Sequence, residues 1–305
     1  MVFLNFRQLK PLFEPRSKSF GSQGLLRPQN GQKQAFAVNE AMNSWEDAVR
    51  EVEFWLKDKL SFSLPAYKIQ KVNLQKWRAQ LNADGLSRLE ALESKYELNH
   101  WEKVCSASEF TGNCCFLDIL DRVTAHEKIQ GPGLDIGSRS FWYAPALQGF
   151  LPGEWLGVEL DANQRYLTGE TRKGYAEYMI RPWPAMHYQA GCLTDIKPSF
   201  GFITWFLPYV AIEPLQSSGL PERFFQPKDL LRHTMSLLAD TGYLFIINQE
   251  REEAQIQESL FNQLGIQFQA LGKIDSVFSV YEKERFGFLV RQGDNMHLSR
   301  DCERP

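Results

Sequence analysis

The pattern of apolar and polar positions changes character near residue 131. Before it, apolar residues recur at steps of three and four, with Glu and Lys between them, which is typical of amphipathic helices. We expect helices over 41–60, over 74–96 with an interruption near Asp84 and Gly85, and over 114–126. Strand-like alternation is absent, so the pattern predicts an all-helical accessory or cap module over 36–130.

After Gly131, short apolar runs alternate with amphipathic segments of about a dozen residues. We expect strands over 134–136, 155–159, 187–192, 202–206 and 243–248, and a hairpin of 278–281 with 286–291. Pro227 is placed to open a helix that Gly242 ends, and Glu252 and Glu253 suit the first turn of another. Alternation of this kind predicts an α/β fold with a doubly wound, mostly parallel sheet over 131–292, followed by a C-terminal tail over 293–305.

The charge is distributed unevenly along the 305 residues. The net charge is -3, but the first 35 residues carry +5, from six basic residues against Glu14, and the remainder therefore carries -8. The basic residues are Arg7, Lys10, Arg16, Lys18, Arg27 and Lys33. We interpret 1–35 as a mobile basic tail, with an organellar transit peptide as the alternative. An acidic body gives no electrostatic reason to bind DNA or RNA, so nucleic acid is not an expected partner.

Membrane, disulfide and metal chemistry are not indicated. The longest apolar run, over 202–212, contains Pro208 and falls well short of the roughly 20 residues that span a bilayer. We therefore expect no membrane partner. Five cysteines without regular spacing favour a reducing compartment, and the cytoplasm is the default location. The neighbouring Cys114 and Cys115 cannot easily turn to one tetrahedral zinc, so no metal site is expected.

The turn after the first expected strand has the pattern of a nucleoside site. "LDIGSRS" places Asp135 and Gly137 at this turn, and the next strand ends at Glu159, 24 residues after Asp135. An acid about 20 residues past a glycine turn is placed to accept both ribose hydroxyls. A nicotinamide-binding turn would need Gly-x-Gly-x-x-Gly after the strand, whereas bulky Phe141 follows here. A nicotinamide-dependent oxidoreductase is therefore disfavoured.

Order and spacing over 131–291 resemble the class I S-adenosylmethionine-dependent methyltransferases. The family's first-strand motif, acid-x-Gly-x-Gly, is matched by "DIGSR" at Asp135 and Gly137, with Ser138 between and Arg139 in place of the second glycine. "GVELDANQ" resembles the second strand, which implies that Glu159 binds the ribose. "GCLTDI" resembles the end of the third strand, which implies that Asp195 binds the adenine amino group. The resemblance implies a seven-stranded, Rossmann-like sheet with S-adenosylmethionine as cofactor.

The same resemblance suggests where methyl transfer would occur. "FITWFLPYV" stands at the fourth strand, whose end faces the methyl group, so the aromatic faces of Trp205, Phe206 and Tyr209 are candidates to contact the sulfonium. Glu213 is a candidate for proton handling. Family members that methylate amide or ring nitrogens carry Asn or Asp, two prolines and an aromatic there, and only the last two positions match.

The functional prediction is methyl transfer from S-adenosylmethionine to a small molecule. The alternative is a methyltransferase-like binding or scaffold protein without turnover, since Arg139 departs from the family's glycine loop. The sequence leaves the acceptor and the oligomeric state open.

Overall fold

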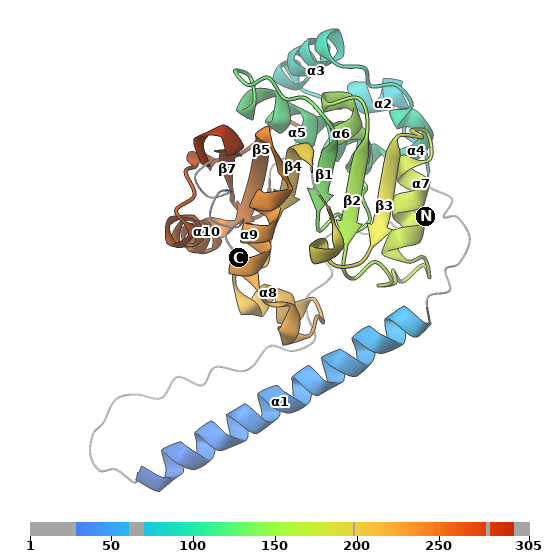
Figure 1. The fold of residues 1–305 in the computed structure, drawn as a ribbon. Helices are drawn as coiled ribbons and strands as arrows, with labels where there is room; N and C mark the ends of the chain where they lie inside the picture. The colour runs from blue at the N-terminus through green and yellow to red at the C-terminus, as the bar shows by residue number, and fades with distance from the viewer. Residues whose placement is uncertain (1–28, 61–69, 198, 279–280, 296–305) are drawn as a thin grey trace, which may run out of the picture. The chain divides into compact units, whose positions relative to one another are not determined.

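A seven-stranded sheet forms the centre of the molecule (Figure 1). The computed structural model describes residues 29–60, 70–197, 199–278 and 281–295, with side chains from residue 44. The strand order is β3-β2-β1-β4-β5-β7-β6. The strands are β1 Gly133–Ile136, β2 Trp155–Glu159, β3 Met186–Ala190, β4 Phe200–Phe206, β5 Leu238–Gln249, β6 Gln269–Lys273 and β7 Arg285–Arg291.

The strand directions give the fold. β1 to β5 run parallel, and β7 is antiparallel to both β5 and β6. The order reverses at β1, between β2 and β4, which in a doubly wound sheet is where ligands bind beyond the carboxyl ends of the strands. This topology is that of the class I methyltransferase fold and confirms the predicted mostly parallel, seven-stranded architecture.

Some helices alternate with the strands and cover both faces of the sheet, and others precede the first strand in the chain. They are α1 Gln29–Lys59, α2 Leu74–Arg78, α3 Ala83–Lys95, α4 Trp101–Val104, α5 Ala107–Val123, α6 Ala144–Phe150, α7 Arg172–Ile180, α8 Ile212–Ser217, α9 Pro227–Leu237 and α10 Glu250–Leu264. Among the described residues before Gly133 no strand occurs, as the pattern predicted. Residues from Glu46 onward form one compact unit, and Met1–Trp45 are assigned to another.

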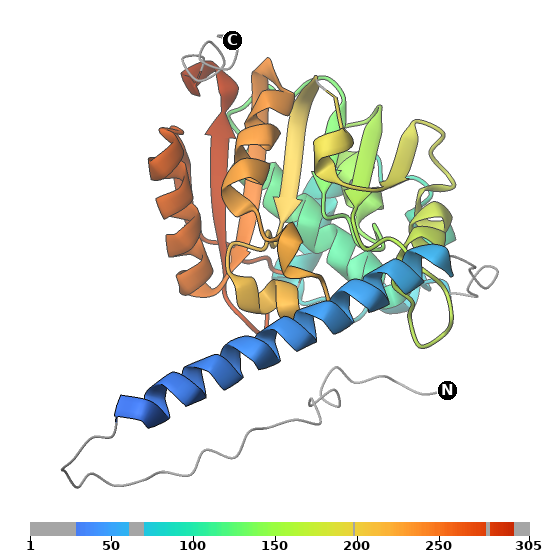
Figure 2. The same cartoon turned by 60° about the horizontal axis from the view of Figure 1, so that its bottom comes forward.

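Helices lie on both faces of the sheet (Figure 2), and an apolar core lies between the sheet and the helices on each face. Phe202 and Phe245 belong to the core that includes residues of α3, α5, α6 and α7. Their strand neighbours Ile203 and Leu244 point the other way, into the core under α9 and α10. Both faces are thus buried, which explains why these strands read as continuous apolar runs.

Capping residues define the ends of several helices. α3 begins where the Asn82 side chain accepts from the Gly85 N–H at 2.8 Å. α5 begins with a capping box, in which Ser106 and Glu109 bond each other's backbone N–H. α10 ends at Gly265, whose φ of 68° is the left-handed conformation that glycine adopts without steric cost.

Several element boundaries differ from the sequence expectation. The strand expected over 278–281 is wrong, because the partner of β7 is Gln269–Lys273, and residues 279–280 lie outside the described residues. Gly242 does not end a helix, since α9 stops at Leu237 and β5 already starts at Leu238. The interruption expected near Asp84 lies earlier, at 79–82, and α5 starts at Ala107, not at residue 114.

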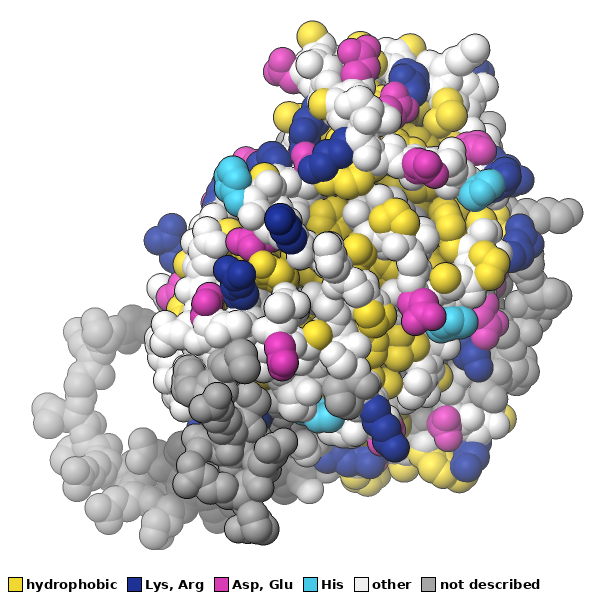
Figure 3. Space-filling model, turned by 45° about the horizontal axis from the view of Figure 1, so that its top comes forward, with side chains coloured by type: hydrophobic (Ala, Val, Ile, Leu, Met, Phe, Trp, Pro, Cys, Tyr) yellow, Lys and Arg dark blue, Asp and Glu magenta, His cyan; other side chains and the backbone are white. Residues whose placement is uncertain are grey.

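The surface shows no dominant sign of charge on the face drawn in Figure 3, where acidic and basic side chains are interspersed and apolar ones gather near the middle. This agrees with the small net charge of the chain. Among the described helices, none has the length and apolar character needed to cross a membrane.

Candidate functional site

The loop after β1 takes a left-handed conformation at three alternate residues. φ is 69° at Gly137, 50° at Arg139 and 51° at Phe141. Only glycine adopts this region without a Cβ clash, and each other residue costs roughly 1–2 kcal/mol. The loop therefore keeps a backbone shape suited to glycine at two positions where the chain has larger residues.

Burial of Phe141 offsets part of this strain. Its ring is fully buried and lies against β2, where a Cβ on Gly157 would be only 2.9 Å from a ring carbon. Arg139 is exposed, and its carbonyl accepts from the Tyr188 hydroxyl at 2.6 Å. No atom lies within 4 Å of where a Cβ of Gly137 would stand, so space is available beside this glycine. The loop is thus anchored by Phe141 and accessible at Gly137.

Asp135 lies under the loop, shielded from solvent. Its carboxylate accepts from the Thr204 hydroxyl at 2.6 Å and from the Tyr143 hydroxyl at 2.7 Å, and the Ser138 hydroxyl donates to its backbone carbonyl at 2.8 Å. Burial raises the pKa of Asp135 to about 7, although the bonds from Thr204 and Tyr143 favour the charged form. Asp135 therefore fixes the base of the loop and would not touch a ligand directly.

This burial predicts a pH-dependent effect of Asp135→Asn. The folded-state pKa of Asp135 lies above the unfolded value of about 3.9, so its contribution to stability declines as pH rises from about 4 to 7. The neutral amide does not titrate. We expect the unfolding free energy of the variant, relative to the parent chain, to rise by about 2–3 kcal/mol between pH 5 and 8 in urea titrations. A difference that stays constant over this range would contradict the assignment.

Glu159 joins the loop after β1 to the loop after β2. Its Oε2 accepts from the Arg139 N–H at 2.8 Å, and its Oε1 accepts from the Asp161 N–H at 2.8 Å. Arg172 approaches Oε1 at 3.3 Å. The side chain is only 7% exposed, so these three donors, and not water, solvate most of its charge. Glu159 is consequently held in one orientation at the carboxyl end of β2.

Arg172 forms ion pairs with two buried carboxylates. It lies 3.3 Å from Glu159 and 3.4 Å from Asp161, and Lys57 lies 3.6 Å from the other oxygen of Asp161. Burial lowers the pKa of Arg172, but the two carboxylates outweigh burial, so its pKa is raised overall. Burial raises the pKa of Asp161 in spite of Arg172 and Lys57. The candidate site therefore depends on one buried cation.

Sequence reasoning missed Arg172 and Asp161. One signal was present, since Arg172 is the first residue of α7, where the helix dipole disfavours a cation. A basic residue at that position indicates a carboxylate partner elsewhere in the fold.

The remaining predicted residues are dispersed. Asp195 ends the short 3-10 helix η2 (Leu193–Asp195) and is exposed. Trp205 is buried in the core under α9 and α10. Tyr209 is half-buried, donates to the Ser218 hydroxyl at 2.8 Å and lies near enough to influence Arg172. Glu213 is exposed in the first turn of α8. The structure thus brings Asp135, Gly137, Ser138, Arg139 and Glu159 together.

An aromatic cluster lies at the end of β4, on the face of the sheet opposite to the side chain of Trp205. The ring of Phe206 lies 4.8 Å from that of Phe116 and 5.3 Å from that of Tyr143, and Phe116 stacks on Tyr143 at 4.9 Å. Phe206 and Phe116 are only partly buried. Of the neighbours on β4, Phe206 is therefore the one whose ring lies beside the loop after β1.

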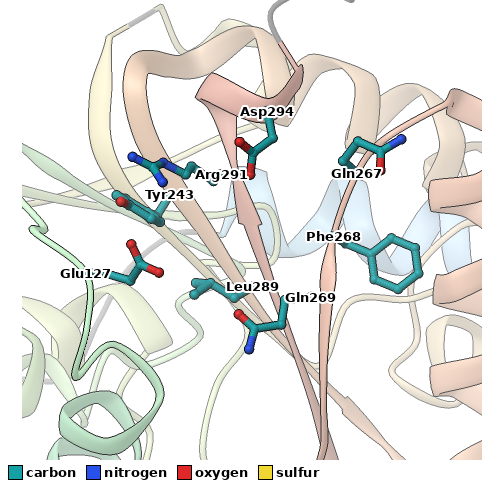
Figure 4. Close-up of a pocket in the computed structure, with 8 residues that line it drawn as sticks. All are labelled: Glu127, Tyr243, Gln267, Phe268, Gln269, Leu289, Arg291 and Asp294. Carbon is teal, nitrogen blue, oxygen red and sulfur yellow. The ribbon is translucent and has the colours of Figure 1, made fainter.

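Two hollows occur away from these residues. One, of about 320 Å³, lies beside β5, β6 and β7, where Glu127, Tyr243 and Arg291 lie close together (Figure 4). The other, of about 520 Å³, is next to the turn between β6 and β7 and includes Tyr281 and Arg285. Among the described residues, no cluster of His, Cys, Asp and Glu has the arrangement of a metal site.

Comparison with known proteins identifies structural relatives only. No family model and no curated protein sequence matches the chain. A SAM-dependent methyltransferase from Aquifex aeolicus is similar over 65% of this chain and 99% of its own, with 15% identity and a TM-score of 0.43. Magnesium protoporphyrin IX methyltransferase from Synechocystis PCC 6803, solved with bound SAM, is similar over 70% of this chain and 94% of its own, with 12% identity and a TM-score of 0.41.

A third solved structure, ribosomal protein L11 methylase from Lactobacillus delbrueckii, covers 57% of this chain and 78% of its own, with 14% identity and a TM-score of 0.39. The names of these proteins point to chemically different acceptors. Similarity at this level does not indicate what the present chain binds, and the fold assignment rests on the strand order.

Proposed function

We propose that the chain binds S-adenosylmethionine beyond the carboxyl ends of β1, β2 and β3 and transfers its methyl group to a small molecule. The observation that carries this proposal is the carboxylate of Glu159, buried and fixed at 2.8 Å against the backbone of the loop that follows β1. In a doubly wound sheet this is the position of a ribose-binding acid. The space beside Gly137 lies in the same loop.

The residues present fit the cofactor. A carboxylate offers about four acceptor sites, and three donors address Glu159, so one site is available for a ribose hydroxyl. The contact from Arg172, at 3.3 Å, is the longest of the three and the one that a second hydroxyl would displace. Gly137 would allow the amino-acid end of the cofactor to approach the backbone, and Asp195 would accept from the adenine amino group.

When bound, the cofactor would supply a methyl group on a sulfonium. The protein mainly has to align the acceptor with this group and exclude water. The rings of Phe206, Phe116 and Tyr143 form an apolar wall beside the loop, and aromatic faces attract a sulfonium by roughly 0.5–2 kcal/mol. Phe206 is therefore a better candidate than Trp205 for this contact.

The acceptor is proposed to be a small molecule. The end of β4 carries Leu207, Pro208 and Tyr209, without the Asn or Asp that members acting on amide or ring nitrogens have. Tyr209 and Glu213 lie on the segment after β4 and are the candidates to orient the acceptor or accept its proton. The acidic body of the chain also disfavours a nucleic-acid acceptor.

A binding protein without turnover is the second candidate. It is favoured by the loop itself, because Arg139 and Phe141 occupy left-handed positions and Glu159 already has three internal donors. Such a protein would keep the fold and the nucleoside site without transferring a methyl group.

Titration calorimetry of the full chain separates these functions. We expect micromolar binding of S-adenosylmethionine and none of NADH. Incubation with methyl-labelled cofactor and a pool of small metabolites should then transfer label to a compound of low molecular mass. Binding without transfer would support the second candidate, and tight binding of NADH alone would contradict both.

A further inference from the structure

Asn248, at the carboxyl end of β5, is a fully buried amide. It is 0% exposed, and neither its Nδ2 nor its Oδ1 has a hydrogen-bond partner among the described residues. Burial of an amide is unfavourable unless new hydrogen bonds replace those it made to water, and folded chains pair nearly all such groups. The side chain of Asn248 is therefore a candidate ligand-binding group.

The surroundings of Asn248 explain why no protein group pairs with it. Leu244 and Ile246 of β5 point into the core under α9 and α10, and the alternation of side chains along a strand directs Asn248 to the same face. The residue opposite Asn248 on β7 is Phe286, and Trp205 of β4 lies in the same core. The amide is consequently a polar group at the end of an apolar layer.

Strained backbone flanks this amide on both sides. φ is 59° at Leu207 after β4 and 60° at Glu250 after β5, which is the left-handed region in each case. Leu207 directly follows the residue that pairs with Ile247, so it lies beside Asn248 in the sheet. Glu250 is two residues beyond Asn248 in the chain. Together with the strained loop after β1, these turns lie at the carboxyl edge of the sheet, and such strain is concentrated at functional sites.

The end of β5 is also where an acceptor would lie in the proposed function. The cofactor is proposed to occupy the ends of β1, β2 and β3, with its methyl group toward the end of β4, and β5 is the next strand. Neighbouring strands are about 4.8 Å apart, so Asn248 is one strand spacing from the end of β4. Phe206 and Asn248 point to opposite faces, so a molecule that contacts both must lie across the edge of the sheet.

Leu207 is the exposed residue next to the buried amide. Its side chain is 36% exposed, and its left-handed backbone is a conformation that leucine adopts only at a cost. A ligand that displaces Leu207 would reach Asn248 from the solvent side. Release of the left-handed conformation would offset part of the cost of this opening.

We propose that the carboxamide of Asn248 binds the methyl acceptor through two hydrogen bonds, with Nδ2 donating and Oδ1 accepting. The complementary group presents a donor beside an acceptor, as the edge of a lactam or of a primary amide does. This edge serves recognition, and the methylated atom lies elsewhere on the acceptor. That the ligand is the methyl acceptor rests on the proposed function, but binding of such an edge does not require turnover.

The isomers 2-pyridone and 4-pyridone test this pairing in the full chain. 2-Pyridone has its N–H and its carbonyl side by side, whereas 4-pyridone has them on opposite sides of the ring and cannot pair with one amide. In nuclear magnetic resonance spectra of protein with isotope-labelled asparagine, the side-chain signals of Asn248 are identified by their loss in Asn248→Leu. We expect 2-pyridone to shift these signals until they saturate, with and without S-adenosylmethionine, and 4-pyridone to bind at least about tenfold more weakly.

Thermal stability provides a second readout. Asn248→Leu removes the unpaired amide at nearly constant volume, so it should raise the melting temperature by about 2–6 °C and abolish transfer of label. Gln257→Met is the matched control, since Gln257 is 1% exposed on α10 and its Nε2 also has no partner among the described residues. This control should also melt above the parent chain, but it should leave 2-pyridone binding and label transfer unchanged.

Failure of this inference and failure of the proposed function give different results. Signals of Asn248 that do not move, or that move equally with both isomers, would overturn the inference even where S-adenosylmethionine binds. An Asn248→Leu chain that melts below the parent would also overturn it, because the amide would then have a partner in the folded chain. A chain that binds 2-pyridone at Asn248 but does not bind S-adenosylmethionine would contradict the proposed function and support the pairing at Asn248.

Discussion

Arg172→Met is expected to lower the unfolding free energy by about 3–5 kcal/mol at pH 7, because removing one partner of a buried ion pair leaves the other charge without compensation. Arg172 is 8% exposed and serves two carboxylates, Glu159 and Asp161. Methionine keeps the volume of the aliphatic stem without the charge. Chemical denaturation of the purified variant measures the loss.

The pH dependence of this loss identifies its cause. Burial already raises the pKa of Asp161, and without Arg172 this pKa should rise further, so protonation of Asp161 relieves unpaired charge and the loss should shrink from pH 8 toward pH 4. Adding Asp161→Asn to Arg172→Met should restore part of the stability. Arg232→Met is the control, since Arg232 is 51% exposed and pairs only with its helix neighbour Asp229. An Arg172→Met chain as stable as this control would refute the role of the buried cation.

Glu159→Ala is expected to weaken S-adenosylmethionine binding at least a hundredfold. Each hydrogen bond between a buried carboxylate and a ribose hydroxyl contributes about 1.5–3 kcal/mol, and the variant would lose two. It would also release the N–H of Arg139, which Glu159 holds at 2.8 Å, so the loop after β1 would lose one of its anchoring contacts. Calorimetric titration of the variant measures the change in the dissociation constant.

Two controls separate recognition of the ribose from general damage to the site. Asp195→Ala should weaken binding much less than Glu159→Ala, because Asp195 is exposed and water competes for its hydrogen bonds. Glu213→Ala should leave cofactor affinity unchanged, since Glu213 is exposed in the first turn of α8 and is proposed to act on the acceptor, not on the ribose. If Glu159→Ala bound the cofactor as tightly as Glu213→Ala, the ribose would lie elsewhere.

Most strands of the sheet could be predicted from the sequence because they are buried on both faces and appear as short apolar runs. β2 was expected over 155–159, and these are its observed bounds. The edge strand β6 was missed because Gln269–Lys273 has little apolar character and is mostly exposed, so the pattern carries no signal for it. β5 begins earlier than expected because Leu238 pairs with Phe200 beyond the irregularity, and the polar residues between Leu238 and Tyr243 hide this start from the apolar pattern.

The sequence could predict which residues form the candidate site, but not which groups these residues contact. The spacing placed Asp135 and Glu159 at the ends of neighbouring strands, where β1 and β2 do pair. The sequence could not show whether Trp205 or Phe206 lies beside the loop. Both faces of β4 carry apolar residues, so no alternation of polar and apolar positions indicates which side chain points to which face. The link from Arg172 to Glu159 spans 13 residues and depends on the path of the intervening loop.

The central claim is that the carboxyl ends of β1 and β2 form a nucleoside site, and a crystal structure of the chain with S-adenosylhomocysteine tests it most directly. The account predicts the ribose hydroxyls within hydrogen-bond distance of Glu159 and the amino-acid end of the ligand beside Gly137. A structure with the ligand bound elsewhere, or with Glu159 keeping only its internal donors at saturating ligand, would contradict it.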